Sequence, residues 1–176
     1  IALFSTPERR AEARSSMVKN AQVPADQLFE APKDARPTKL LPVTGGFVFD
    51  LGGRRLEVIE VPGHTQGGIC LLDRKHALLF TGDNNNTLQW QFLDTSTTIE
   101  AYLRTLEGQK ARADFTTLLP GHGPALDRGF LDEQIACARS ILDGTCKDEP
   151  YKSFAGESRL CRHGRAQIAF DPAKVR

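Results

Sequence analysis

Three side chains with metal-binding chemistry each follow an apolar run and a glycine. They are His64 in the segment VPGHT, Asp83 in LFTGD and His122 in LPGHG. Imidazole nitrogen and carboxylate oxygen are ligands that zinc accepts in proteins, and zinc makes its bound water acidic enough to react near neutral pH. The three residues therefore predict a metal site that serves hydrolysis, and no further catalytic residue is identified.

The residues around the three candidates support a shared role. A glycine directly before each one permits a sharp turn and a close approach of the backbone. Pro62 and Pro120 stand two residues before the two histidines and end the preceding strands. A single histidine or aspartate beside a glycine is commonly only a turn residue. Three such arrangements in one chain favour a common metal site over three unrelated turns.

Short strands are expected to deliver the candidates to loops. Alternating apolar and polar residues predict a β-hairpin at 46–60, and apolar runs predict strands at 69–72, 77–81, 115–119 and 166–170, with a polar turn at 73–75. A side chain at the end of a strand is held by the sheet while its tip remains accessible to ligands. We therefore expect His64, Asp83 and His122 at strand ends.

Two helices are expected in the later half of the chain. Thr97 and Glu100 form a capping box for a helix that ends between residues 110 and 113. A second helix begins near Gly129, and Gly144 is its C-terminal glycine.

The first 45 residues predict less regular structure. A strand is expected at 1–4 and a surface helix at 7–19, while the prolines and charges of 20–45 indicate a loop or linker. After Asp83, a polar loop at 84–87 leads to an aromatic-rich segment at 88–93 that flanks the candidate site. Within that segment we expect Trp90 to pack in the core or a lid rather than to serve as a substrate platform.

Composition limits the class of protein. With 176 residues, 40% hydrophobic and 26% charged, the chain is expected to form one compact domain over 1–176. A net charge of +1 without a basic block gives no support for nucleic-acid binding, and no apolar run approaches the ~20 residues that a membrane-spanning helix needs. We expect a cytoplasmic protein with a small-molecule substrate. Because the chain begins at Ile1 rather than Met, a removed secretory signal remains an alternative.

The four cysteines and the two other histidines, His76 and His163, are expected to be structural. The four cysteines form no CxxC pair and are sparse, which predicts reduced thiols. Cys161 and His163 stand close together but in an arginine-rich tail, so ligation by them is disfavoured. His76 follows a charged turn and is expected to be exposed, without a chemical role.

The three histidine and aspartate motifs resemble the second, third and fourth metal-binding motifs of the metallo-β-lactamase superfamily. The segments are VPGHTQGG, LFTGD and LLPGHGP, and the resemblance covers roughly 46–125. It implies a mixed α/β (α+β) fold, here a partial αββα sandwich that is mostly its C-terminal half. It also implies two zinc ions: His64 completes the ligands of one, Asp83 bridges both and His122 binds the other.

The family's first motif, HxHxDH, is absent from this sequence. In the family it supplies four further ligands, so we expect that the chain is truncated at its N-terminus. On its own it would then bind metal weakly and expose part of an apolar sheet face.

The resemblance implies hydrolysis by a metal-bound hydroxide that attacks an ester, thioester, lactone or amide. A glyoxalase II-like activity is disfavoured because residues 84–93 lack the Gly-rich, Arg-containing stretch that follows the TGD of those enzymes. Two alternatives remain open: an iron-dependent member of the sulfur dioxygenase or oxygen reductase type, and a non-catalytic fragment or pseudo-enzyme.

Overall fold

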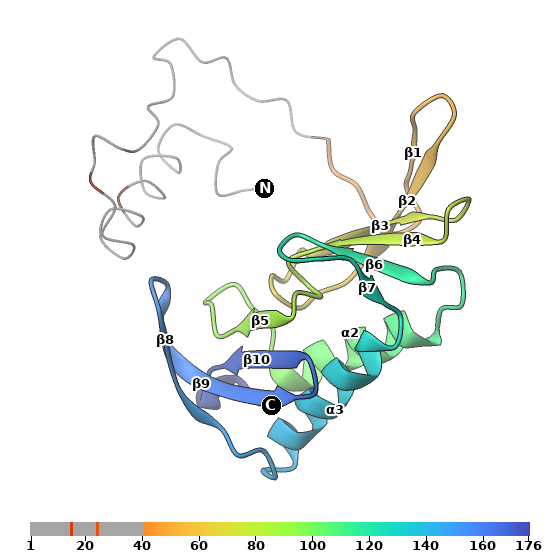
Figure 1. The fold of residues 1–176 in the computed structure, drawn as a ribbon. Helices are drawn as coiled ribbons and strands as arrows, with labels where there is room; N and C mark the ends of the chain where they lie inside the picture. Colours follow the sequence, from red (N-terminus) through yellow and green to blue (C-terminus); the bar gives the residue numbers. More distant parts are fainter. Residues whose placement is uncertain (1–14, 16–23, 25–40) are drawn as a thin grey trace. The chain divides into compact units, whose positions relative to one another are not determined.

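A computed structural model describes residues 41–176 together with Ser15 and Pro24 (Figure 1). The strand expected at 1–4 lies outside these residues, as does the helix at 7–19 except for Ser15, which is helical. Of the linker expected at 20–45, Pro24 and residues 41–45 are described, and none of them lies in a helix or strand.

Contacts divide the chain into two units. One comprises residues 43–151 and 158–176 and contains helices 99–111 and 130–142 and most of the described strand residues. Of the other unit, the structure describes Ser15, Pro24, residues 41–42 and a hairpin tip at 152–157, where Lys152 Nζ lies 3.1 Å from a carboxylate oxygen of Glu157. The single-domain organisation stays a prediction.

The larger sheet has six strands in the order β1-β2-β3-β4-β6-β7. Their bounds are β1 Val48–Asp50, β2 Arg55–Glu60, β3 Ile69–Asp73, β4 Leu78–Gly82, β6 Thr117–Pro120 and β7 Leu126–Asp127. The expected hairpin is confirmed as the antiparallel pair β1 and β2. β4 and β6 are parallel, so the loops that follow these two strands leave the sheet at the same edge.

The smaller sheet has four strands in the order β5-β10-β9-β8. Their bounds are β5 Leu88–Gln91, β8 Glu149–Ser153, β9 Gly156–His163 and β10 Ala166–Phe170. β5 is an edge strand and pairs in parallel with β10, the strand expected at 166–170. The aromatic-rich segment is therefore part of a sheet.

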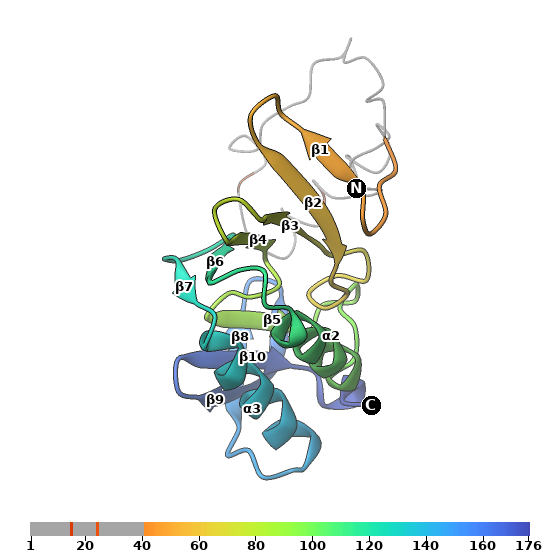
Figure 2. The same cartoon turned by 90° about the vertical axis from the view of Figure 1, so that its right-hand side faces the viewer.

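Both helices expected in the later half of the chain are present, and they lie side by side in Figures 1 and 2. They are α2 Ile99–Ala111 and α3 Phe130–Leu142. The capping box predicted from Thr97 lies one residue too early, because the N-cap of α2 is Thr98, whose side chain accepts a hydrogen bond from the Ala101 N–H. Gly144 follows the C-cap of α3 with φ +67°, a left-handed conformation that glycine adopts without steric cost. A short 3₁₀ turn, η3 Pro172–Lys174, lies near the C-terminus.

One apolar core joins the helices to both sheets. Its members include Leu72, Leu79 and Leu118 from the larger sheet, Leu106, Phe130 and Ile135 from the helices, and Ile168 and Phe170 from β10. By register, Leu71, Phe80 and Leu119 share the opposite face of the larger sheet and are half-buried. This is a mixed α/β fold, which confirms the expected class.

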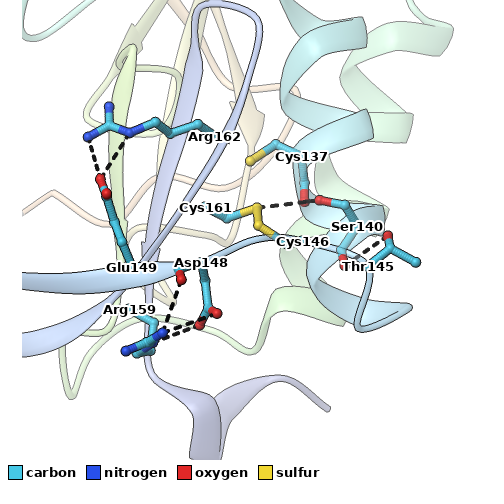
Figure 3. The surroundings of a disulfide bond; sticks show 9 residues. All are labelled: Cys137, Ser140, Thr145, Cys146, Asp148, Glu149, Arg159, Cys161 and Arg162. Atoms are coloured by element: carbon cyan, nitrogen blue, oxygen red, sulfur yellow. Dashed lines mark hydrogen bonds and ion pairs between the residues drawn. A yellow bond between two sulfur atoms is a disulfide. The ribbon is translucent and has the colours of Figure 1, made fainter.

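The expectation of four reduced thiols is wrong for one pair. Cys146 and Cys161 form a disulfide that ties the segment after α3 to β9, and the Ser140 hydroxyl lies 3.4 Å from Cys161 Sγ (Figure 3). Their separation of 15 residues hid the pairing, which only the fold brings together. Cys70 and Cys137 are free and buried, and burial raises the pKa of each thiol to about 12.

The first residue of the polar turn expected at 73–75 is buried. Asp73 is the last residue of β3 and is 0% exposed. Its carboxylate accepts hydrogen bonds from the Arg54 guanidinium, from the backbone N–H of His76 at 3.1 Å and from Nδ1 of His76 at 2.8 Å. A buried carboxylate is tolerated here because a cation and hydrogen bonds compensate its charge. The His76 side chain is 48% exposed, as expected.

Candidate metal centre

The fold brings the three sequence candidates to one edge of the larger sheet. Asp83 directly follows β4, and His122 follows the parallel strand β6. His64 lies in the loop between β2 and β3, whose Ile69 end lies at the same edge because β3 is antiparallel to β4. All three candidates therefore occupy loops held by strand ends.

Asp83 lies between the two imidazoles. Its Oδ2 is 4.0 Å from Nε2 of His64, and its Oδ1 is 3.4 Å from Nε2 of His122. The side chains become more exposed from His64 at 21% to Asp83 at 43% and His122 at 80%. The cluster is thus open to solvent on the His122 side.

The ring of His64 is oriented by the smaller sheet. Its Nδ1 lies 2.9 Å from the backbone oxygen of Trp90 in β5. Because a carbonyl oxygen only accepts, this hydrogen bond places the proton of the neutral ring on Nδ1 and leaves the lone pair on Nε2, the atom that faces Asp83. The Ser96 hydroxyl also donates to the backbone oxygen of His64 at 2.8 Å. Such outer contacts fix the orientation of metal-binding histidines.

Two asparagines hold the candidate ligands from the loop that follows Asp83. The side-chain oxygen of Asn84 accepts the backbone N–H of His64, and that of Asn86 accepts the backbone N–H of His122, each at 3.1 Å. The Asn86 amide also donates to Asp83 Oδ1 at 3.3 Å. Sequence reasoning treated this segment as a polar loop, but Asn84, Asn85 and Asn86 are all buried. The available signal was three consecutive asparagines directly after a candidate ligand.

Two glycines are required by close contacts rather than by turn geometry alone. A Cβ on Gly121 would lie 2.6 Å from Asp83 Oδ1, and a Cβ on Gly63 would lie 2.1 Å from the side-chain oxygen of Asn84. Real Cβ atoms do not approach heavy atoms this closely, so the carboxylate and the amide sit where only glycine leaves room.

The side chains of the cluster supply some, but not all, of the ligands that a divalent metal ion needs. Within the described residues, no group of three or more His, Cys, Asp and Glu side chains is arranged to hold a metal ion by itself. The cluster nevertheless presents two imidazole nitrogens to one partly exposed carboxylate, a nitrogen and oxygen set that suits zinc. His64, Asp83 and His122 can therefore contribute part of a coordination shell.

Trp90 packs against other aromatic side chains. Its ring centroid lies 5.3 Å from that of Phe92, and its indole N–H donates to the Tyr151 hydroxyl at 3.2 Å. These contacts agree with the packing role expected for Trp90.

Among the described residues, no helix has the length and apolar character that crossing a membrane requires.

Comparison with known sequences identifies related proteins. A sequence model of the metallo-beta-lactamase superfamily matches residues 4–125. The acyl-coenzyme A thioesterase MBLAC2 of Gallus gallus is 37% identical over 91 residues, which cover 49% of this chain and 32% of that protein. The protein of the same name from Homo sapiens is 33% identical over 94 residues, with the same coverage of 49% and 32%. The chain thus spans about a third of the length of these relatives.

Solved structures share the fold. A metallo-beta-lactamase superfamily protein from Sulfolobus tokodaii matches with a TM-score of 0.56 and 20% identity, over 80% of this chain and 54% of that one. A family protein from Thermus thermophilus matches with a TM-score of 0.51 and 20% identity, over 83% and 52%. At this identity the likeness concerns the fold alone.

Proposed function

Because this chain belongs to the metallo-beta-lactamase superfamily, we propose that the protein is a metal-dependent hydrolase that cleaves acyl thioesters. The observation that carries the proposal is the convergence of His64, Asp83 and His122 from three separate loops at one sheet edge. The thioester is chosen among the ester, lactone, amide and thioester substrates because the related MBLAC2 proteins are named acyl-coenzyme A thioesterases.

The three residues would share the work of holding the metal. His64 would bind through Nε2, because its Nδ1 is engaged by the Trp90 carbonyl. Asp83 would bind through a carboxylate that Asn86 orients, and His122 through the Nε2 that faces it. Zinc sites usually have about three protein ligands for each ion, so further ligands from elsewhere in the protein would complete the shell. A bound zinc ion supplies Lewis acidity and a reactive water near neutral pH.

The decisive experiment measures metal content and hydrolysis together on the full-length natural protein. We expect bound zinc and release of free coenzyme A from acyl-coenzyme A, with kcat/KM reduced on the order of 100-fold or more in His122→Ala. A β-lactam and a lactone serve as comparison substrates. Bound iron with oxygen consumption would replace this proposal by an oxygen-dependent activity. Absence of hydrolysis by zinc-loaded protein on every substrate would refute it.

A further inference from the structure

A closed set of buried polar side chains lies beneath the asparagine loop, Asn84–Asn86. Asn85 donates from Nδ2 to Gln109 Oε1 at 3.2 Å and to Gln134 Oε1 at 2.8 Å. Gln109 donates back to Asn85 Oδ1 at 3.0 Å. Gln109 comes from α2 and Gln134 from α3, and none of the three residues is more than 2% exposed. The central side chain of the loop is therefore fixed by both helices.

The backbone of the same loop is held by the same helices. The Tyr102 hydroxyl of α2 donates to the carbonyl oxygen of Asn84 at 2.7 Å. Gln134 donates to the carbonyl oxygen of Asn86 at 3.4 Å and to the Tyr102 hydroxyl at 3.1 Å. Complete burial raises the pKa of Tyr102 well above its ordinary value, so the phenol keeps the proton that it donates. We call Asn85, Tyr102, Gln109 and Gln134 the amide network.

The buried side-chain nitrogen and oxygen atoms of the amide network all have hydrogen-bond partners, and this favours a single conformation of the asparagine loop. The second amide proton of Gln109 is directed at Cys70 Sγ at 3.4 Å, so that both of its donors are used. None of the four residues has a buried side-chain nitrogen or oxygen without a hydrogen-bond partner. In a low-dielectric interior, an alternative loop conformation would leave several of these groups unpaired. The network therefore favours one conformation of the loop over its competitors.

The asparagine loop connects the amide network to the candidate ligands through hydrogen bonds. Its side chains alternate: Asn85 points into the amide network, while Asn84 and Asn86 hold the backbone N–H groups of His64 and His122. We infer that the amide network positions His64 and His122, and through Asn86 also Asp83, for metal binding. Its four members are positioning residues, since the hydrogen bonds of their side chains within the described part of the chain go to the loop, to one another and to Cys70 rather than to His64, Asp83 or His122. This inference rests on the proposed metal site.

The test replaces one buried glutamine in the network and one outside it. Gln134→Met removes the amide while keeping a side chain of similar length, and takes one hydrogen bond from each of Asn85, the Tyr102 hydroxyl and the Asn86 carbonyl. Gln89→Met is the matched control. Gln89 is 0% exposed on β5 and donates to Gln91 Oε1 at 3.0 Å, and among the described residues its side chain forms no hydrogen bond with the asparagine loop.

The first measurement needs no metal. In metal-free protein, we expect the backbone amides of His64 and His122 to exchange with solvent about 10-fold faster in Gln134→Met than in Gln89→Met, with amides of β3 and β4 alike in both. Equal exchange of His64 and His122 in the two variants would overturn the inference. If Gln134→Met does not fold, Tyr102→Phe, which removes one hydroxyl, is expected to change the same two amides in the same direction.

The second measurement is the zinc dissociation constant of the full-length protein, obtained by competition with a chromophoric chelator. We expect Gln134→Met to bind zinc about 10 to 100-fold more weakly than wild type, and Gln89→Met to bind it as wild type does. Equal affinity in the two variants would contradict the inference. Absence of zinc binding by wild type would refute the proposed function, and the exchange of His64 and His122 would then decide the positioning role by itself.

Discussion

Near each end of strand β4 an aspartate lies beside histidine, and the two aspartates have opposite surroundings. At one end, Asp73 is 0% exposed and is compensated by Arg54 and His76. At the other end, Asp83 is 43% exposed and faces Nε2 atoms of His64 and His122. Among the described residues, no lysine or arginine forms an ion pair with Asp83.

The difference shows what separates a structural ion pair from a candidate metal site. The carboxylate of Asp73 already has a cation and hydrogen-bond donors from its own protein, which leaves little capacity for a further cation. The carboxylate of Asp83 accepts one amide hydrogen bond at 3.3 Å and is otherwise turned toward imidazole nitrogens. Residue types are the same at both ends, so the partners decide the chemistry.

The largest expected effect is a loss of zinc affinity on replacement of Asp83 but not of Asp73. Asp83→Ala removes the carboxylate between the two imidazoles, and we expect zinc affinity of the full-length protein to fall by about 100-fold or more. Asp73→Ala is expected to leave zinc affinity unchanged and to lower the melting temperature instead. Zinc titration and thermal unfolding of both variants check this. Similar zinc affinities in the two variants would remove the distinction between the two ends of β4.

A smaller effect is expected from a change that leaves Asp83 itself intact. Gly121→Ala places a Cβ 2.6 Å from Asp83 Oδ1, so the carboxylate must move away from its present position. We expect zinc affinity to fall roughly 10-fold, in line with other changes that displace ligands without deleting them. Gly67→Ala is the control, because no heavy atom lies within 4 Å of the added Cβ. Unchanged affinity in Gly121→Ala would show that the carboxylate position is not critical.

The smallest effect concerns acid stability at the Asp73 end. Burial pushes the pKa of Asp73 upward, but hydrogen bonds from His76 and Arg54 outweigh it, so the pKa lies below its ordinary value. A carboxyl group with a lowered folded-state pKa adds stability above its unfolded pKa of about 4 and loses it as the pH falls further.

We therefore expect Asp73→Asn to lower the melting temperature by roughly 5 °C between pH 5 and pH 7. The gap to wild type should narrow below pH ~4, because Asp73 binds a proton there in the unfolded chain before it does so in the folded protein. Other carboxylates paired with arginine, such as Asp114 and Glu133, also have lowered pKa values, so both proteins lose stability in acid. Only the difference between them isolates Asp73. A gap that stays constant down to pH ~2 would contradict this assignment.

Much of the fold was predictable because it follows from local patterns. Period-two alternation located the hairpin of β1 and β2, and helical spacing located α2 and α3 to within a few residues. The candidates His64, Asp83 and His122 were predicted from glycine and proline contexts that mark strand ends, and the structure brings them together. Their role in binding metal stays a prediction.

The features that sequence missed depend on contacts between distant segments. The disulfide of Cys146 and Cys161 requires the chain to return along β9. The burial of Asp73 depends on Arg54, which lies directly before β2 and 19 residues earlier in the sequence. The asparagine loop looked solvent-exposed, because a run of polar residues gives no sign that Gln109 and Gln134 will enclose it from two helices. Such compensation becomes visible only in three dimensions.

The hydrogen bond between His64 and β5 affects which substitutions the protein can accept during evolution. The acceptor is the main-chain oxygen of Trp90, so it is present whatever side chain occupies position 90. Substitutions of the Trp90 side chain can therefore alter its aromatic packing without removing the acceptor that fixes the tautomer of the His64 imidazole. In effect, the orientation of His64 and the side chains of β5 can be altered separately by mutation.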